Sequence, residues 1–124
     1  MNVEETKLRG YFIIKPGVFK DSRGHFFESY NKKEFNKAIG KEVDFVQDNQ
    51  TFSTKGVLRG LHYQMDECAQ AKLVRVIKGN VLDVSVDLRK RSLTYGEHIA
   101  VELSQENKKQ LFVPRRFPRL CCFK

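Results

Sequence analysis

The sequence has few of the features that mark secreted or membrane proteins. Its apolar runs are only a few residues long, so none of them could span a bilayer. The N-terminal residues, MNVEETKLRG, include acidic side chains and no apolar stretch, which argues against a secretory signal. Cysteine is scarce: there are three, and Cys121 and Cys122 are adjacent, which is a poor disulfide framework. We therefore expect a soluble protein of the reducing cytoplasm, without a membrane partner.

Acidic residues are also in short supply. With 15 acidic residues against 23 Lys and Arg residues, the formal net charge is +8. Four of the basic residues, Arg115, Arg116, Arg119 and Lys124, lie in the final stretch RRFPRLCCFK, which contains no acid. A solvated basic surface would explain the charge, and so would an anionic partner. The chain has no basic helix and no Lys/Arg run with interleaved aromatic residues, so a small phosphorylated ligand is better supported than nucleic acid.

Short alternating segments make up most of the chain, whose 124 residues suffice for one domain. A helix is expected at residues 31–40, where Phe35, Ala38 and Ile39 share a face and Gly40 can end the helix. Residues 11–30 predict two strands around a Pro-Gly break and an Asp-Ser-Arg-Gly turn. Further strands are expected within residues 43–52, 56–64, 72–88, 97–104 and 108–114. Many short strands with one helix predict an all-β, mainly antiparallel sandwich or barrel.

Residues 72–88 predict a hairpin with Gly79 and Asn80 as its two-residue turn. The second arm alternates strictly, so Leu82, Val84, Val86 and Leu88 share one face, and Val81, Asp83, Ser85 and Asp87 share the other. The polar face could meet solvent, or in a barrel it could line a polar cavity, and the periodicity does not choose between them. The two aspartates could then be buried hydrogen-bond acceptors for strand backbone or for Arg75.

The segments VLRGLHYQ and AQAKLVR bring Arg59, His62 and Lys72 close together in the sequence. A histidine can accept a proton near neutral pH, and Arg and Lys can hold phosphate or stabilise an oxyanion. The set suits proton abstraction next to a carbonyl on an anionic substrate, although a strand histidine between surface cations would look the same. Arg59 and His62 can share a cavity only if the strand is bulged, and Gly60 would permit that.

A catalytic metal is not expected. Metal-binding β-barrels commonly use a His-x-His pair, but Gln64 stands two residues after His62. The other histidines, His25 and His98, lie in separate segments. Cys68 has no base nearby in the sequence, so a nucleophilic role is not expected either.

Four long stretches resemble a known family: GVFKDSRGHFFESYNKKEF, FVQDNQTFSTKGVLRGLHYQ, AQAKLVRVIKGNVLDVSVDLRKRSLTYG and VELSQENKKQLFVPR. Together, from about residue 7 to Arg115, they are similar to the dTDP-4-dehydrorhamnose 3,5-epimerases. The resemblance implies a cupin-type jelly-roll barrel, a homodimer and a reaction without metal or other cofactor. That reaction is epimerisation at C3 and C5 of a dTDP-4-keto-6-deoxy sugar, on the route to dTDP-L-rhamnose.

The resemblance also implies roles for individual residues. His62 matches the proton acceptor, and Lys72 matches a residue that holds the substrate and the enolate oxygen. The positions that match substrate contacts are Arg23, Glu28, Gln47, Asp48, Asn49 and Arg59. Small departures stand at His25, Gln50 and Ala71, where many members have Phe, His and Gly.

The large departure follows Arg115, where members continue PRGFAHGF and then supply another histidine, a proton-donating tyrosine and the aspartate that pairs with the catalytic histidine. We interpret residues 1–115 as a partial epimerase domain and 116–124 as an aberrant tail, a frameshifted translation of the next strand; a natural variant end is the alternative. The tail's arginines and paired cysteines would then form no phosphate site, metal site or disulfide. The barrel would be incomplete at its C-terminus and marginally stable. An inactive remnant that at most binds dTDP-sugars, a single-carbon epimerase and a keto-isomerase of the same fold stay open.

Overall fold

The computed structural model describes residues 1–62, 71–115 and 117–124, with only the backbone at 61 and 62, and consists mainly of two four-stranded antiparallel sheets. The first sheet contains, in spatial order, β1 (Asn2–Glu5), β2 (Phe12–Lys15), β9 (Gln110–Val113) and β6 (Lys72–Arg75). The second contains β5 (Leu58–His62), β10 (Arg119–Phe123), β7 (Asn80–Val86) and β8 (His98–Ser104). The remaining elements are the hairpin β3 (Val18–Asp21) and β4 (Gly24–Phe27) and one helix, α1 (Lys32–Ile39). The expected all-β, mainly antiparallel class with one short helix is confirmed.

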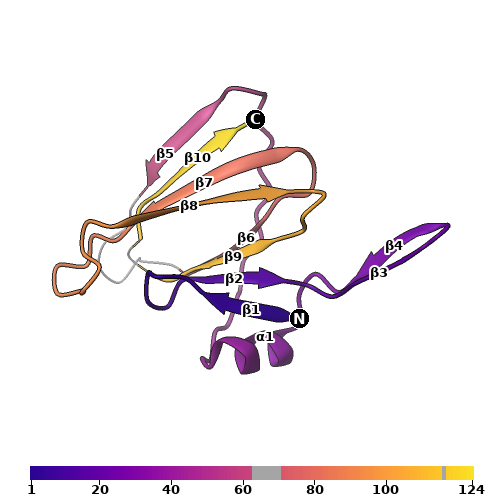
Figure 1. The fold of residues 1–124 in the computed structure, drawn as a ribbon, viewed down its shortest axis with the longest axis horizontal. Helices are drawn as coiled ribbons and strands as arrows, with labels where there is room; N and C mark the ends of the chain where they lie inside the picture. Colours follow the sequence, from indigo (N-terminus) through magenta and orange to yellow (C-terminus); the bar gives the residue numbers. More distant parts are fainter. Residues whose placement is uncertain (63–70, 116) are drawn as a thin grey trace.

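In Figure 1 the second sheet lies above the first, so we call them the upper and the lower sheet. Helix α1 lies below the lower sheet, and the β3–β4 hairpin projects to one side. A buried apolar cluster fills the space between the sheets, with Tyr11, Leu103, Leu111 and Phe117 among its members. A second cluster lies on the other side of the lower sheet, where Ile14 and Phe112 pack against Phe35 and Ile39 of α1. The two central strands of the lower sheet, β2 and β9, are therefore covered on both faces, which suits their apolar stretches FII and LFV.

The helix follows the sequence prediction closely. The Asn31 side chain accepts a hydrogen bond from the Glu34 N–H at 3.1 Å and caps the N-terminus. Gly40 ends the helix in the left-handed conformation, with φ 73°, and its N–H donates to the Asn36 carbonyl. One detail differs: Ala38 is exposed and Asn36 is buried instead, because the Asn36 side chain accepts a hydrogen bond from the Val43 N–H and fixes the chain after the helix.

The predicted hairpin over residues 72–88 is wrong. β6 pairs with β9 in the lower sheet, whereas β7 pairs with β8 and β10 in the upper one, so the chain crosses between sheets at Val76–Gly79. Gly79 does adopt a positive φ of 89°, but its backbone bonds elsewhere: its N–H donates to the Gln105 side chain and its carbonyl accepts from the Gln105 N–H. A glycine turn signal is the same in a hairpin and in a crossover, and here tertiary pairing decides.

Other boundaries also differ from the sequence prediction. Residues 11–30 contain three strands rather than two, because the Pro16-Gly17 break separates β2 from the β3–β4 hairpin. Residues 43–52 form no regular strand, and β1 was not expected. Arg119–Phe123 forms β10, paired on both sides, although the sequence placed the last regular strand before residue 115. The frameshift interpretation of residues 116–124 concerns the coding DNA and stays a prediction.

The two faces of β7 are now distinguished. Val81, Asp83, Ser85 and Asp87 are buried, whereas Leu82, Val84 and Val86 on the other face are only half-buried. The polar face therefore points into the molecule, which is the barrel alternative left open by the sequence. Among the described residues, no helix is long and apolar enough to cross a membrane.

Candidate active site

The strand β5 positions two of the residues that the sequence singled out. Its register with β10 pairs Arg59 with Cys121 and His62 with Arg119, so three steps along β5 correspond to two along β10. This irregularity is the expected β-bulge, and it puts positions 59 and 62 opposite two β10 residues that share a face. The His62 side chain lies outside the described residues.

Gly60 lies within the irregular part of the pairing between β5 and β10. A Cβ at this position would lie 2.2 Å from Cδ1 and 2.8 Å from Cγ of Leu120. The Leu120 side chain therefore occupies the space that any larger residue at 60 would need. The absence of a side chain at Gly60 lets β10 lie against β5.

The two predicted cations lie in different sheets. Arg59 is exposed, and its Nε donates to the Ser53 hydroxyl at 2.8 Å. Lys72 begins β6 in the lower sheet, and its positive charge contributes to lowering the pKa of Asp83, against the larger effect of burial. Lys72 and Asp83 thus come within electrostatic reach of each other although they belong to opposite sheets.

Three side chains on the inward faces of β7 and β10 form what we call the interior ion-pair cluster: Asp83, Arg119 and Cys121. The Arg119 Nε donates to Oδ2 of Asp83 at 2.8 Å, and its Nη2 donates to Sγ of Cys121 at 3.0 Å. The Cys121 thiol in turn donates to the same Asp83 oxygen at 3.4 Å. The Asp83 side chain is 0% exposed and that of Arg119 is 18% exposed.

The electrostatics of this cluster follow from its burial. Burial raises the pKa of Asp83, and the nearby Arg119 guanidinium offsets only part of that effect. Burial and the Asp83 carboxylate raise the pKa of Cys121 to about 11, so this thiol stays protonated at neutral pH and is no nucleophile. Burial lowers the pKa of Arg119, but Asp83, together with Cys121 and Tyr11, outweighs burial and raises that pKa. The cluster therefore provides a fixed cation, and no covalent chemistry.

A buried hydrogen bond lies beside the cluster. The Tyr11 hydroxyl and the Ser85 hydroxyl are 2.7 Å apart, and both residues are 0% exposed. Burial and the Asp83 charge raise the pKa of Tyr11, so it remains a neutral phenol. No pattern in the sequence indicated Tyr11, but the polar residues on the alternating strand β7 did indicate the face that it contacts.

The second buried carboxylate organises a loop. Burial raises the pKa of Asp87, but hydrogen bonds from Arg89, Ser92 and Thr94 outweigh it and hold that pKa well below its ordinary value. The Arg89 guanidinium also lies 4.5 Å from the centre of the Phe117 ring. The expectation that Asp83 and Asp87 are buried acceptors is confirmed. Their partners, however, are Arg119 and Arg89 rather than Arg75.

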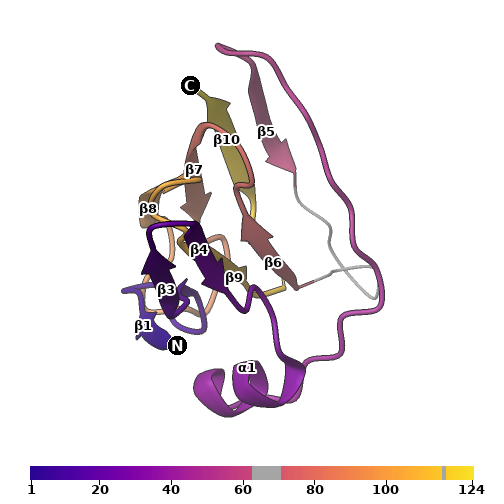
Figure 2. The ribbon, with the colours of Figure 1, turned by 90° about the vertical axis from the view of Figure 1, so that its right-hand side faces the viewer.

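The other predicted substrate-binding residues are not gathered around this cluster. Arg23 lies at the turn of the β3–β4 hairpin, bonds to Asp21 and has a side chain that is 88% exposed. Glu28 follows the hairpin. The exposed residues Gln47, Asp48 and Asn49 lie in the irregular segment between α1 and β5, and the Gln47 amide donates to Asn49. Figure 2 shows that segment running along the side of the molecule where β5 and β6 lie.

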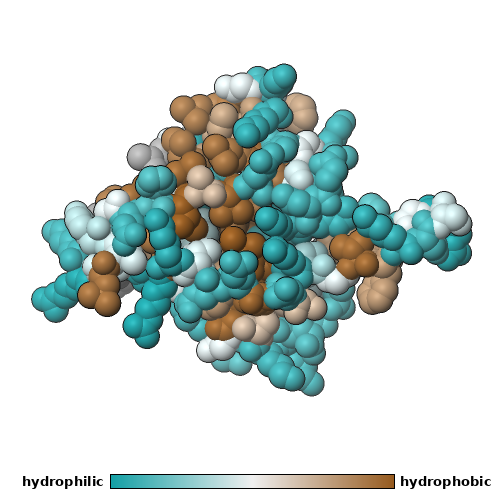
Figure 3. Space-filling model, viewed as in Figure 1, coloured by the Kyte–Doolittle hydropathy of each residue, from teal (hydrophilic) through white to brown (hydrophobic). Residues whose placement is uncertain are grey.

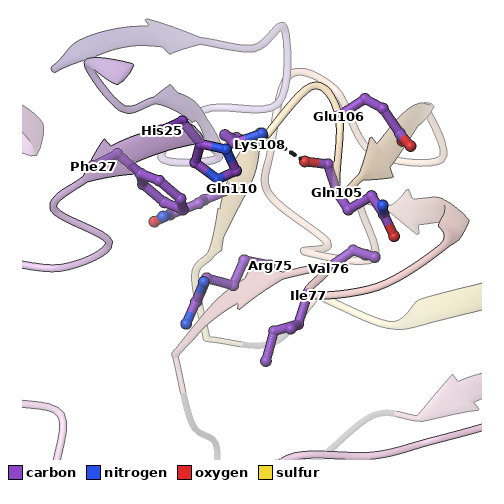
Figure 4. A pocket seen from close by; sticks show the side chains of 9 residues that line it. All are labelled: His25, Phe27, Arg75, Val76, Ile77, Gln105, Glu106, Lys108 and Gln110. Atoms are coloured by element: carbon purple, nitrogen blue, oxygen red, sulfur yellow. Dashed lines mark hydrogen bonds between the residues drawn. The ribbon is translucent and has the colours of Figure 1, made fainter. Parts of the chain in front are cut away.

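A separate pocket of about 370 Å³ lies between β4, the end of β6 and the turn between β8 and β9 (Figure 4). His25, Arg75 and Lys108 line it together with apolar side chains such as Ile77. Of the predicted catalytic and substrate-binding residues whose side chains the structure describes, none lines this pocket. In the sequence His25 was only a small departure from the family pattern, and its neighbours along the chain did not indicate this pocket.

The two facing antiparallel sheets, with buried polar residues on the inner face of the upper one, define the chain as a small cupin-type β-protein. The chain belongs to the dTDP-4-dehydrorhamnose 3,5-epimerase family, whose model matches residues 5–121. It is 53% identical over 122 residues to the Shigella flexneri dTDP-4-dehydrorhamnose 3,5-epimerase, covering 98% of this chain and 67% of that protein. With the corresponding Escherichia coli K12 protein the identity is 49%, covering 94% and 63%.

Solved structures give the same assignment. The structure of the Elizabethkingia anophelis dTDP-4-dehydrorhamnose 3,5-epimerase matches with a TM-score of 0.92 and 49% identity, covering 99% of this chain and 67% of that one. The Legionella pneumophila dTDP-6-deoxy-D-glucose-3,5-epimerase, solved in complex with dTDP-4-keto-L-rhamnose, matches with a TM-score of 0.91 and 43% identity, covering 98% and 64%. The chain thus spans about two thirds of the length of the relatives that it matches.

Proposed function

We propose that the protein acts on a dTDP-4-keto-6-deoxy sugar and epimerises C3 and C5, as a step of dTDP-L-rhamnose synthesis in the cytoplasm. The observation that carries this proposal is the bulge in β5, because it puts positions 59 and 62 opposite two same-face residues of β10. Family membership supplies the reaction class, and the dTDP-4-keto-L-rhamnose in the Legionella structure supports the class of ligand.

The chemistry needs one base and a stabilised enolate. Protons on C3 and C5 are acidified by the adjacent C4 ketone, so a histidine can remove them once the developing oxyanion is stabilised. In the proposal His62 takes the proton, and Lys72 carries the positive charge that stabilises the enolate oxygen. Arg59, on the same strand as His62, binds the diphosphate. Neither a metal nor another cofactor is required for these steps.

The dispersed residues fit a homodimer better than a single chain. The hairpin that carries Arg23 projects from the body and exposes Phe19 and Phe26 at 72% and 69% (Figure 1). Exposed aromatic side chains on a projecting hairpin are typical of an interface rather than of a free surface. A second subunit would bury them and would bring Arg23 and Glu28 next to substrate bound in the other subunit, together with Gln47, Asp48 and Asn49.

The upper sheet offers a second surface for the same contact. Leu82, Val84 and Val86 of β7 are only half-buried there, and Leu58 of β5 is 62% exposed. Figure 3 shows apolar residues gathered in a band across this side of the molecule, between hydrophilic margins. Burial of this apolar surface against a partner would remove it from water and so stabilise the complex.

Deuterium exchange tests the proposal at its first chemical step. The full chain is incubated in D₂O with the dTDP-4-keto-6-deoxy sugar, and label at C3 and C5 is followed by NMR. We expect label at both carbons, and we expect its loss in His62→Asn. His98→Asn is the matched control, because His98 is an exposed histidine on another strand.

Each result has a distinct meaning. Label at both carbons that disappears in His62→Asn supports the proposal, and label without net epimerisation indicates a base that lacks its proton donor. If label appears at only one of the two carbons, the proposal fails and single-carbon epimerisation takes its place. If the folded wild-type chain binds dTDP but introduces no label, it is a binding protein and the proposal fails.

A further inference from the structure

Strand β10 places one arginine on the inner face of the upper sheet. Its register with β7 pairs Arg119 with Ser85 and Cys121 with Asp83, and both β7 residues are fully or almost fully buried. Residues that are directly opposite on neighbouring strands share a face, so Arg119 belongs to the inward one. At 18% exposure its side chain is still partly accessible, whereas that of Asp83 is not.

Both described contacts of Arg119 use the same edge of its guanidinium group. Nε donates to Asp83 and Nη2 donates to Cys121. The group is planar and carries five N–H donors, so the edge that contains Nη1 is directed away from these two partners. Such an edge matches the spacing of two phosphate or carboxylate oxygens and donates two parallel hydrogen bonds to them.

The surroundings favour an anion at that edge. β10 lies next to β5, with Arg119 paired to His62 and Cys121 paired to Arg59, and β5 carries the proposed base. Lys72, an exposed residue of the other sheet, is near enough for its charge to lower the pKa of Asp83. Because Asp83 holds the guanidinium in place, little side-chain entropy is lost when a ligand binds to it.

We propose that Arg119 is a substrate-binding residue and that its Nη1 edge takes a phosphate group of a diphosphate ligand. The inference rests on the proposed function for the identity of that ligand, a nucleoside diphosphate sugar. It departs from the expectation that the arginines of residues 116–124 form no phosphate site. That expectation was made without the structure, in which Arg119 lies on a strand inside the fold. The competing explanation is an ion pair with a structural role alone.

Inorganic pyrophosphate is the probe, titrated calorimetrically into the full chain at low ionic strength, where electrostatic binding is least screened. Arg119→Gln removes the charge, and Arg119→Lys keeps the charge and the pairing with Asp83 but removes the planar fork. Arg115→Gln is the matched control, since it removes the same charge from an exposed position just before β10. Far-UV circular dichroism and a urea unfolding curve establish that each variant is folded.

We expect wild type and Arg115→Gln to bind pyrophosphate with similar affinity, and both Arg119 variants to bind about tenfold to a hundredfold more weakly. Arg119→Lys keeps the test decisive if Arg119→Gln fails to fold. The inference is overturned if Arg119→Lys binds as wild type does, or if the folded wild-type chain does not bind pyrophosphate. Failure of the proposed function would appear separately, as the absence of deuterium label in the sugar.

Discussion

Two Asp–Arg ion pairs of nearly equal length lie in very different surroundings in this molecule. Asp21 and Arg23 on the projecting hairpin are 2.7 Å apart, with side chains 51% and 88% exposed. Asp83 and Arg119 in the interior are 2.8 Å apart, with side chains 0% and 18% exposed. Arg23 lowers the pKa of Asp21, whereas burial raises the pKa of Asp83 in spite of Arg119. A short distance therefore says little about what either pair contributes.

The reason for the difference is desolvation. On the hairpin both charges keep most of their water whether or not they pair, so the pair adds little to stability. In the interior each charge has lost water that only the other charge and nearby dipoles replace, so removal of one partner leaves the other uncompensated. The interior pair is consequently sensitive to mutation without being an efficient way to stabilise the fold.

The largest expected effect comes from the interior pair. Arg119→Met leaves the Asp83 carboxylate buried without its cation, and we expect it to lower the free energy of unfolding by about 3–5 kcal/mol. Urea unfolding followed by circular dichroism measures the change. The double variant Asp83→Asn/Arg119→Met, which removes both charges, should recover most of the loss. If the double variant is as unstable as the single one, the uncompensated charge is not the cause.

The next effect concerns the packing of β10 on β5. Gly60→Ala puts a Cβ 2.2 Å from Leu120, and we expect a loss of about 1–3 kcal/mol, as for other overpacked sites. Gly17→Ala, next to the hairpin, is the matched control because nothing lies within 4 Å of the added atom. The additional substitution Leu120→Ala should relieve the Gly60→Ala strain. Equal unfolding midpoints for Gly60→Ala and Gly17→Ala would disprove this account of the contact.

The dependence of stability on pH should have opposite signs for the two aspartates. The folded-state pKa of Asp83 is raised above its ordinary value of 3.8. Protonation of Asp83 therefore contributes most to the stability of the folded state at pH values below 3.8. This contribution is lost as the pH rises through the folded-state pKa. The folded-state pKa of Asp21 is lowered, so its contribution is present above the ordinary value and is lost as the pH falls. Unfolding curves of wild type, Asp83→Asn and Asp21→Asn between acidic and neutral pH measure the two slopes. Slopes of the same sign would contradict the contrast.

The smallest expected effect on stability comes from the hairpin. Arg23→Gln should leave the urea midpoint unchanged, since both partners are exposed to water. Its effect should appear in catalysis instead, as a higher KM for the nucleotide sugar if Arg23 contacts substrate in a dimer. Lys20→Gln, an exposed change on the same hairpin, is the control. A clear drop in the urea midpoint would show that the exposed pair contributes more to stability than its exposure to water indicates.

Local features of the fold could be predicted from the sequence. The cap residues Asn31 and Gly40 define α1, and alternation with period two identifies most strands. The irregularity in β5 meets a condition that local geometry sets, because two residues three positions apart can share a face only across an irregularity. These predictions depend on neighbours in the sequence, and short-range geometry suffices for them.

Predictions that depend on distant partners failed or stayed open. The turn at Gly79 has the composition of a hairpin, but Gln105 holds it at a crossover between sheets. Alternation on β7 defined two faces without indicating which one is buried. The interior ion-pair cluster joins Asp83 to an arginine 36 positions later, on a segment that was not predicted to be a strand. No pattern within either segment contains that information.

The place of β10 in the upper sheet has a consequence for the order of assembly. β5, which carries Arg59 and the proposed base, is bonded within the described part of the chain to β10, a strand that comes from the far end of the sequence. Contacts between such distant segments are slow to form, because the entropy of closing a long loop must be lost first. During refolding, the helix and the β3–β4 hairpin can form before the site exists, because their contacts are local. The lower sheet also joins distant segments, since β2 pairs with β9. Ligand binding would therefore appear only after both sheets have closed.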